Sequence, residues 1–487
     1  MPGSNISKSY KEPFYFYNVE EFIGLRDEID FAEIRFYPKN ICDLEELVKF
    51  YYIKDEALPH YLSVFPEVDF YSDIIQQDLY YALHSAIAQY YSMPEYRELI
   101  SQLYDKIIQS IPDPAYIYSS KQHFKIYYSK EDISDKVLQV IDDSLEFAND
   151  KLSNYFNSQP YSHHENNVID VVLRFRRGSG GTIPLGPIEI STSTEVIGEE
   201  HLDRLPSLIT HELFHRFQFQ YGFCPLNSCA GSFKGKWFWE GISVWSEWYV
   251  NSCLWEVHSR IDVAFEQAYR PLTEFVYETY LFWQLIYRLA VERKTDGYLI
   301  FKELLEEYSQ SPDNSYQNIH KILIKVLGIF LNQSDLAALH SDYCYQLLLI
   351  PSFSTKCNNT ENLNTFLYKW AVRNIADFEF KQCMVKPIQT LYYHIGKGEL
   401  NKGKAVLVVT NDNIDTLKVE LVHVKLKNLE NSHRTRIFFT EEVGYLIPSN
   451  TSVLNDEDNM YFLLVSSITS MENQETRFKL VNQFFNL

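Results

Sequence analysis

The pentapeptide HELFH, which begins at His211, constrains this chain more than any other stretch. On a helix, residues four apart lie on the same face, so His211 and His215 point in the same direction with Glu212 beside them. Pro206 stands where such a helix begins, and Gly222 stands where it ends. Three polar side chains inside an apolar helix need a partner, and a metal ion is the natural one. A histidine pair satisfied within the protein is the alternative.

A catalytic zinc site has a third protein ligand besides two histidines. Glu240, in the segment WFWEGISVWSEW, is the predicted third ligand, because a carboxylate among aromatic side chains needs a cation. Glu247 lies about two helical turns further on, so it shares the face of Glu240. We expect Glu247 to be an alternative ligand or to hydrogen-bond a ligand histidine. A surface charge is the third possibility for this residue.

These residues resemble the gluzincin class of zinc metallopeptidases and, more distantly, the aminopeptidase N family. In that class, HExxH is followed after a gap by a helix that starts with Glu-Gly and carries a glutamate ligand. The resemblance maps His211, Glu212 and His215 onto the first motif and Glu240 onto the second. It implies a Zn²⁺ cofactor, with Glu212 as the general base that takes a proton from metal-activated water.

The same resemblance suggests two further site residues. The segment FVYETYLFWQL is similar to one whose tyrosine stabilises the oxyanion in the aminopeptidase N family. It maps onto Tyr277, with Tyr280 as the second choice and a core tyrosine as the alternative for each. The glutamate that binds the substrate amine in that family maps onto Glu189, in LGPIEIST. An edge strand that pairs with an extended peptide is an equal interpretation of this segment.

Hydrophobic periodicity and turn residues predict an α+β, multidomain fold. Residues 1–115 are predicted to be mostly helical. The resemblance to gluzincins implies that residues 116–384 form a gluzincin-like (thermolysin-like) catalytic domain. Within it, residues 116–222 carry a small mixed sheet and the HELFH helix, and residues 223–384 are helical. Residues 385–487 carry short strands separated by polar turns, which predicts a β-sandwich.

The individual elements predicted around the site are a helix and three strands. The helix covers residues 136–156, and the strands cover residues 123–129, 167–175 and 187–192. The glycine-rich stretch RRGSGGTIPLG is predicted to be a turn. The strands predicted in the last region are 405–410, 417–426, 435–440, 460–469 and 476–485.

Composition limits the partners and the compartment. A net charge of −21 over 487 residues argues against nucleic acid or an anionic membrane as the main partner. No apolar run approaches a membrane span, and the first residues lack the apolar core of a signal peptide. Seven cysteines, an odd number, argue against a disulfide scaffold. We therefore expect a cytoplasmic protein, with export that needs no cleaved leader, as for a bacterial effector, as the alternative.

The sequence thus predicts a zinc-dependent peptidase that acts on a peptide or protein substrate. Two alternatives stay open at this point. One is a catalytically idle zinc scaffold that binds a partner through the β-sandwich, although the intact Glu212 disfavours it. The other is a zinc hydrolase with a non-peptide substrate, since the same chemistry opens other bonds. The sequence predicts no oligomeric state.

Overall fold

A computed structural model of the chain describes part of the sequence, and the description below concerns that part. Its helices and strands mix in an α+β fold, as predicted. The chain divides into two compact units, and helices α10 (Lys236–Asn251) and α13 (Ile300–Ser309) contribute residues to both. The described residues are 14–16, 34–36, 108, 111, 113–162, 164, 166–174, 180–182, 186–198, 201–222, 235–251, 270–312, 315–332, 336–347, 373–374, 382–385, 389–395, 404–409, 417–425, 433–437, 445–446, 459–467 and 476–484.

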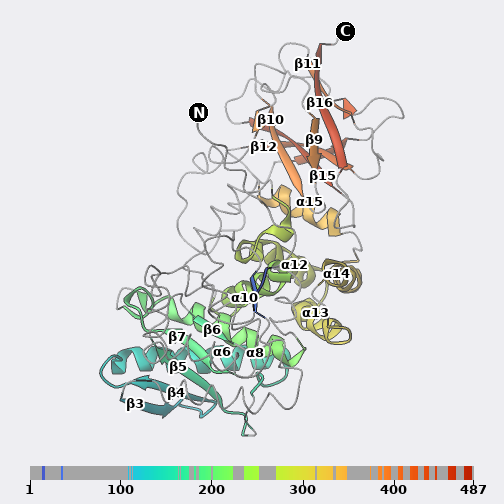
Figure 1. The fold of residues 1–487 in the computed structure, drawn as a ribbon. Helices are drawn as coiled ribbons and strands as arrows, with labels where there is room; N and C mark the ends of the chain where they lie inside the picture. The colour runs from blue at the N-terminus through green and yellow to red at the C-terminus, as the bar shows by residue number, and fades with distance from the viewer. Residues whose placement is uncertain are drawn as a thin grey trace, which may run out of the picture. The chain divides into compact units, whose positions relative to one another are not determined.

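The first unit is built on a five-stranded sheet (Figure 1). Its strands lie in the order β3 (Pro114–Tyr118), β4 (Phe124–Ser129), β5 (Ile169–Arg174), β7 (Ile188–Ser191) and β6 (Gly180–Thr182). Strands β4, β5 and β7 are parallel, and the two outer strands β3 and β6 are antiparallel to their neighbours.

The three parallel strands are those that the sequence predicted, and the two antiparallel ones were missed. Strand β6 lies in the glycine-rich stretch interpreted as a turn, and β3 begins at a proline beside the boundary predicted at residue 115. Glycine and proline are rare inside strands but tolerated at sheet edges, which explains both omissions. The edge-strand interpretation of residues 187–192 is wrong, because β7 has β5 on one side and β6 on the other.

Helices α6 (Asp135–Phe156) and α8 (Leu205–Gln220) lie on the same side of this sheet (Figure 1), and the short helix α7 (Thr194–Ile197) precedes α8. The ring of Phe156 stacks on that of Phe217 with centroids 4.9 Å apart. As predicted, α8 has Pro206 in its first turn and ends before Gly222, whose φ of 77° suits only glycine well. The predicted helix at 136–156 is confirmed as α6.

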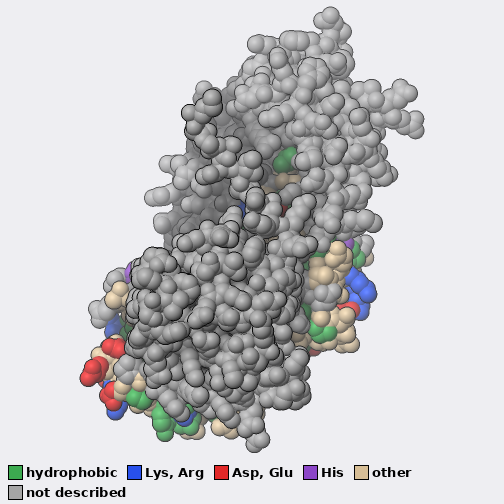
Figure 2. Space-filling view, viewed as in Figure 1, with side chains coloured by type: hydrophobic (Ala, Val, Ile, Leu, Met, Phe, Trp, Pro, Cys, Tyr) green, Lys and Arg blue, Asp and Glu red, His purple; other side chains and the backbone are tan. Residues whose placement is uncertain are grey.

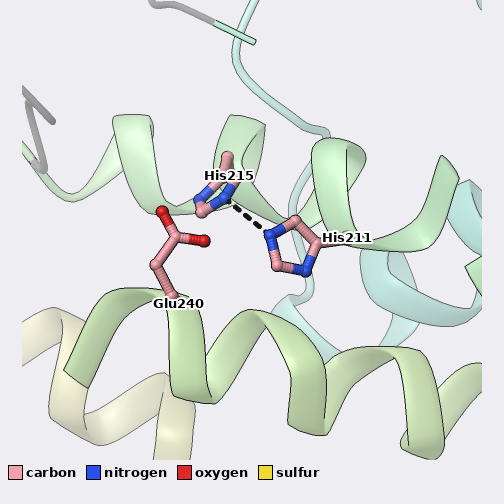
Figure 3. A group of neighbouring side chains, drawn as sticks. All are labelled: His211, His215 and Glu240. Atoms are coloured by element: carbon pink, nitrogen blue, oxygen red, sulfur yellow. Dashed lines mark hydrogen bonds between the residues drawn. The ribbon is translucent and has the colours of Figure 1, made fainter. Parts of the chain in front are cut away.

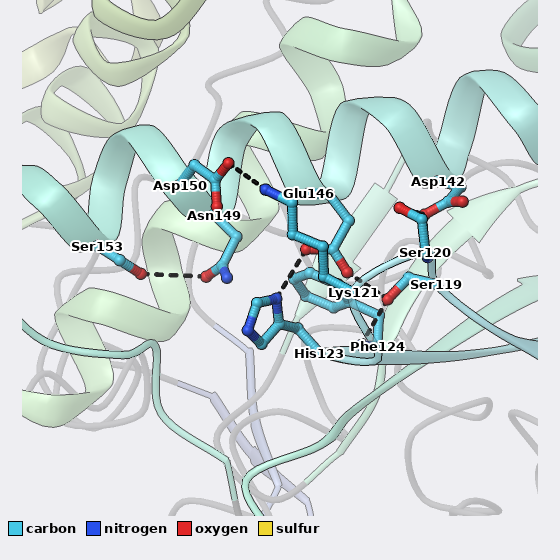
Figure 4. A network of polar contacts seen from close by, with 10 residues as sticks. All are labelled: Ser119, Ser120, Lys121, His123, Phe124, Asp142, Glu146, Asn149, Asp150 and Ser153. Carbon is cyan, nitrogen blue, oxygen red and sulfur yellow. Dashed lines mark hydrogen bonds and ion pairs between the residues drawn. The ribbon is translucent and has the colours of Figure 1, made fainter.

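Polar contacts fasten the turn between β3 and β4 to helix α6 (Figure 4). Glu146 is buried and holds two residues of the turn, the hydroxyl of Ser119 and the Nδ1 atom of His123 at 2.7 Å. Three acidic residues of α6 each bind a different part of this turn: Asp142, Glu146 and Asp150. The turn is therefore held to the helix along about two helical turns.

The edge strand β3 and its neighbour β4 carry aromatic side chains at the surface, and Figure 2 shows hydrophobic side chains in this part of the molecule. Tyr116 and Tyr118 are exposed, and Tyr116 lies 6.0 Å from the ring of Tyr127. The ammonium of Lys125 sits 4.3 Å from the ring centre of Tyr116, a cation–π contact.

The second unit begins with a helical part. It contains α12 (Tyr280–Arg293), α14 (Tyr316–Leu331) and α15 (Leu336–Leu347), with the 3₁₀ turns η5 (Leu272–Glu274), η6 (Tyr277–Thr279) and η7 (Gly297–Leu299). Aromatic rings fill its core: Trp245 lies 4.1 Å from Phe301 and 5.1 Å from Tyr287. The described residues between 236 and 347 therefore match the helical prediction, which covered residues 223–384. Near the end of that range the prediction is wrong, because β8 (Arg373–Asn374) and most of β9 (Gln382–Val385) lie there as strands.

Two β-sheets follow in the second unit. The strands of the first sheet lie in the order β13 (His433–Ile437), β12 (Leu417–Lys425), β15 (Asn459–Ser467), β10 (Thr390–Ile395) and β8 (Arg373–Asn374). The strands of the second sheet lie in the order β14 (Tyr445–Leu446), β11 (Lys404–Val409), β16 (Thr476–Phe484) and β9 (Gln382–Val385). Each of the five strands predicted in this region is present. The buried carboxylate of Glu420 in β12 accepts a hydrogen bond from Ser341 in α15 and pairs with Lys418 at 3.2 Å.

Most of residues 1–115 lie outside the described residues, and with them most of the predicted helical region. Two short parallel strands are described there, β1 (Phe14–Phe16) and β2 (Ile34–Phe36). The predicted domain boundaries stay predictions. None of the described helices has the length and the apolar run that a membrane crossing requires.

Candidate metal centre

Helix α8 presents the two histidines of HELFH to the same point. The Nε2 atoms of His211 and His215 face each other at 3.2 Å, and both side chains are buried. This approach follows from the helix itself, because residues four apart stand one above the other. The local geometry is the one that the sequence predicted.

The Nδ1 atom of each histidine is hydrogen-bonded to a different neighbouring side chain. The Nδ1 atom of His211 lies 2.8 Å from a carboxylate oxygen of Glu247, and the Nδ1 atom of His215 lies 2.6 Å from the amide oxygen of Gln218. An amide oxygen only accepts hydrogen bonds, and so does an ionised carboxylate. Both Nδ1 atoms therefore donate, which leaves both Nε2 atoms as acceptors with lone pairs.

Glu240 reaches the histidine pair from helix α10 (Figure 3). One ligand atom from each of His211, His215 and Glu240 lies within 4.8 Å of the other two, and Glu240 is half-buried. The structure thus brings together the three side chains predicted as ligands. The described residues hold this one group that could bind a metal ion.

The donor set fits a cation. Two imidazole lone pairs that face each other at 3.2 Å repel unless a positive charge lies between them. Two nitrogens bound to a tetrahedral zinc ion at the usual bond length lie about 3.3 Å apart. The carboxylate of Glu240 adds a negative charge within 4.8 Å of a ring nitrogen of each histidine. Position, protonation and charge therefore all suit a metal ion.

The end of α10 is tied to the start of α8, which positions Glu247. The side-chain amide of Asn251 donates to the hydroxyl of Thr210 at 3.1 Å and to the carbonyl of Pro206 at 3.3 Å. These bonds hold the last turn of α10 against α8. The hydrogen bond that we predicted for Glu247 as one of its two roles is present, and it is buried.

Glu212 lies against the edge strand β6. A Cβ atom added to Gly180 would stand 3.1 Å from a carboxylate oxygen of Glu212 and 2.8 Å from a methyl carbon of Leu208. The backbone of β6 therefore runs directly beside the buried Glu212 carboxylate. Only a glycine leaves room for this approach without moving one of the two side chains.

The sheet register directs Glu189 away from this group. Gly180 faces α8, and its partner across the ladder is Ile190. Neighbouring residues on a strand point to opposite faces, so Glu189 points to the face opposite α8. There its carboxylate pairs with Arg174 at 2.6 Å and is buried. This placement gives no support to a role for Glu189 beside the histidines.

The two candidate tyrosines differ in exposure. Tyr277 opens the 3₁₀ turn η6 and is 41% exposed, whereas Tyr280 opens helix α12 and is 1% exposed. A tyrosine that donates a hydrogen bond to a bound substrate must be accessible to it. Exposure thus favours Tyr277, the first choice from the sequence, over Tyr280.

Sequence reasoning missed Gln218 and Gly180. A signal for Gln218 was available, because it lies three residues after His215 and so on the same helical face. No local signal pointed to Gly180, because its nearness to Glu212 depends on how β6 pairs with β7.

Comparison with known proteins adds no relative to this description. The chain matches no protein-family model and no curated protein.

Proposed function

We propose that this chain is a zinc-dependent peptidase that hydrolyses peptide bonds. The observation that carries the proposal is the pair of Nε2 atoms 3.2 Å apart on His211 and His215, with the carboxylate of Glu240 beside them. Two imidazoles and one carboxylate are a ligand set of catalytic zinc sites, which keep one coordination position open. Zinc bound there would lower the pKa of water and polarise a carbonyl group.

Glu212 is the proposed general base. Its carboxylate takes the proton of the attacking water and then delivers it to the leaving nitrogen of the cleaved bond. Its position supports this role, because it is next to a proposed ligand histidine on α8 and lies against Gly180. It is not one of the three residues of the metal group, so the proposed role does not compete with metal binding.

The neighbourhood of Glu212 also supports a peptide as substrate. Strand β6 is the last strand of its sheet among the described residues, and its backbone runs beside Glu212. An extended peptide that added to this edge as a further strand would carry its carbonyl groups past that carboxylate. The backbone of the peptide would then be recognised by main-chain hydrogen bonds, whatever its side chains.

Tyr277 is the proposed donor to the oxyanion that forms when the carbonyl is attacked. Its exposure supports this role over the buried Tyr280. We also propose that the catalytic region has the thermolysin-like arrangement of gluzincins, and that residues 385–487 form a β-sandwich. The two largely antiparallel sheets of that region support the sandwich.

The test begins with metal content. Elemental mass spectrometry of the purified full chain should find about one zinc ion per chain, in keeping with a single three-ligand group. The Glu240→Ala variant should lose that ion. A wild-type chain that holds no zinc, after zinc is supplied and the excess removed, would overturn the proposal.

The second step is cleavage of a mixed library of quenched fluorescent peptides. Glu212→Gln should keep zinc and lose turnover, because the amide cannot take a proton. Glu131→Gln, at an exposed glutamate of the same unit, is the matched control and should change neither property. Full turnover in Glu212→Gln would rule out the mechanism.

A further inference from the structure

The turn that carries Tyr277 packs very closely on the helix that carries Glu240. A Cβ atom added to Gly241 of α10 would stand 2.0 Å from the hydroxyl oxygen of Thr279 and 2.5 Å from the indole nitrogen of Trp283. Neither approach is possible beside any residue other than glycine. The residue after Glu240 is therefore a glycine because a neighbouring segment occupies the space of its side chain.

Two buried donors from that segment converge on one backbone carbonyl of α10. The hydroxyl of Thr279 lies 2.7 Å from the carbonyl oxygen of Trp237, and the indole N–H of Trp283 donates to the same oxygen at 3.1 Å. The rings of Trp237 and Trp283 stack with centroids 5.5 Å apart. All three side chains are fully buried, so water does not compete for these hydrogen bonds.

The hydroxyl of Thr279 bridges two segments. Besides the Trp237 carbonyl, it lies 2.8 Å from the carbonyl oxygen of Val276, the residue before Tyr277. Trp237 stands one helical turn before Glu240. The one hydroxyl group of Thr279 thus lies between a carbonyl of the tyrosine turn and a carbonyl in the first turn of the ligand helix, and these two acceptors share its single proton.

We infer that Thr279 and Trp283 are positioning residues that fix Glu240 and Tyr277 relative to one another. The inference rests on the proposed function, since it concerns the proposed zinc ligand and the proposed oxyanion donor. It adds two residues with no chemical role of their own. Through the carbonyl of Trp237, both hold the backbone from which Glu240 reaches the metal group, and through the carbonyl of Val276, Thr279 also holds the turn that presents Tyr277.

A role in packing alone makes a different prediction. Valine has nearly the shape of threonine but lacks its hydroxyl group, so Thr279→Val would fill the same space. If the contact were only packing, that variant would keep the site intact. If the hydroxyl positions the two segments, Thr279→Val shifts Glu240 and Tyr277, while Thr279→Ser, which keeps the hydroxyl, restores them.

The experiment compares three test variants and one control variant of the full chain with the wild type. Thr279→Val and Thr279→Ser test the hydroxyl, and Trp283→Phe removes the second donor while keeping an aromatic ring. Thr390→Val is the matched control, because Thr390 is equally buried and its hydroxyl bonds Ser466 at 2.8 Å in a strand of the C-terminal region. Zinc affinity is measured by competition with a chromogenic chelator. The visible spectrum of bound Co²⁺ reports the arrangement of the ligands.

In Thr279→Val we expect the zinc dissociation constant to rise about 10-fold, as for other residues that orient a ligand, and the Co²⁺ spectrum to change. With the peptide that the wild type cleaves best, kcat should fall roughly 100-fold, the effect of a misplacement of about 1 Å, and KM should change little. Trp283→Phe should give a smaller change in the same direction. Thr279→Ser should restore all three properties, and Thr390→Val should keep them.

If Thr279→Val has the zinc affinity, the Co²⁺ spectrum and the kcat of the wild type, the inference is overturned. The proposed zinc site would not be affected by that result. The absence of zinc from the wild type would instead overturn the proposed function. If Thr279→Val does not fold, the inference is tested with Thr279→Ser and Trp283→Phe instead. A loss of zinc affinity in Thr279→Ser equal to that of a variant without the hydroxyl would also overturn the inference.

Discussion

Removal of the Glu247 carboxylate should weaken zinc binding at the proposed metal centre without removing any of the three proposed ligands. In the structure that carboxylate lies 2.8 Å from the Nδ1 atom of His211, and both side chains are buried. The contact keeps the proton on Nδ1, so that the lone pair of Nε2 faces His215. Glu247→Leu leaves the Nδ1–H group without its carboxylate, and the ring is then free to change its tautomer or to rotate.

The size of the effect follows from this geometry. Partners that orient a ligand histidine typically contribute 10- to 100-fold to metal affinity, which corresponds to about 1.4 to 2.7 kcal/mol. Glu247 belongs near the upper end, because its hydrogen bond is short and shielded from water. Glu247→Gln keeps an acceptor but loses the charge, so its zinc affinity should lie between those of the wild type and Glu247→Leu.

The chain provides a matched control for this measurement. Glu146 is also a buried glutamate of the first unit, and it holds the Nδ1 atom of His123 at 2.7 Å (Figure 4). Its histidine is not part of the metal group. Glu146→Gln should therefore lower thermal stability and leave the zinc affinity, measured by chelator competition, at its wild-type value.

A Glu247→Leu variant that binds zinc as tightly as the wild type would refute this reasoning. Equal losses of zinc affinity in Glu247→Leu and Glu146→Gln would refute it too. In that case the loss would come from general destabilisation of the unit rather than from the orientation of His211.

Three other predictions concern stability and the substrate edge. Burial lowers the pKa of His340 to about 3. Between about pH 3 and about pH 6.5, the imidazole is therefore protonated only in the unfolded chain, and the free energy of unfolding decreases as the pH is lowered through this range. Urea unfolding should show a loss of about 2 kcal/mol from pH 7 to pH 5, and His340→Leu should lack this component. Gly180→Ala should lower kcat roughly 10-fold with zinc content unchanged, because the added Cβ pushes on the Glu212 carboxylate; unchanged kcat in peptide cleavage would contradict this. Gly241→Ala should cost about 1 to 3 kcal/mol or more in urea unfolding, because its Cβ would overlap Thr279, and a fully stable variant would mean that the two segments separate easily.

Much of the fold was predictable wherever the local pattern was strong. The buried strands β4, β5 and β7 and the amphipathic helix α6 have clear periodicity, and each was predicted within a few residues. Strands β3 and β6 were not, because proline and glycine mask an edge strand in the sequence. These two strands form because a neighbouring strand provides hydrogen-bonding partners for their backbone. A short stretch of sequence does not show whether such a neighbour is present.

The sequence by itself determined the core of the candidate site. His211, Glu212 and His215 lie within two turns of one helix, so the helical repeat sets their relative positions whatever surrounds them. The need for a cation beside a carboxylate that lies among aromatic residues pointed to Glu240 in the same way. Only the tertiary structure decided that Glu247 is the partner of His211, that β6 passes beside Glu212, and that Glu189 faces away. These features join segments far apart in the chain, and their geometry is set by sheet register and helix packing, which no single segment encodes.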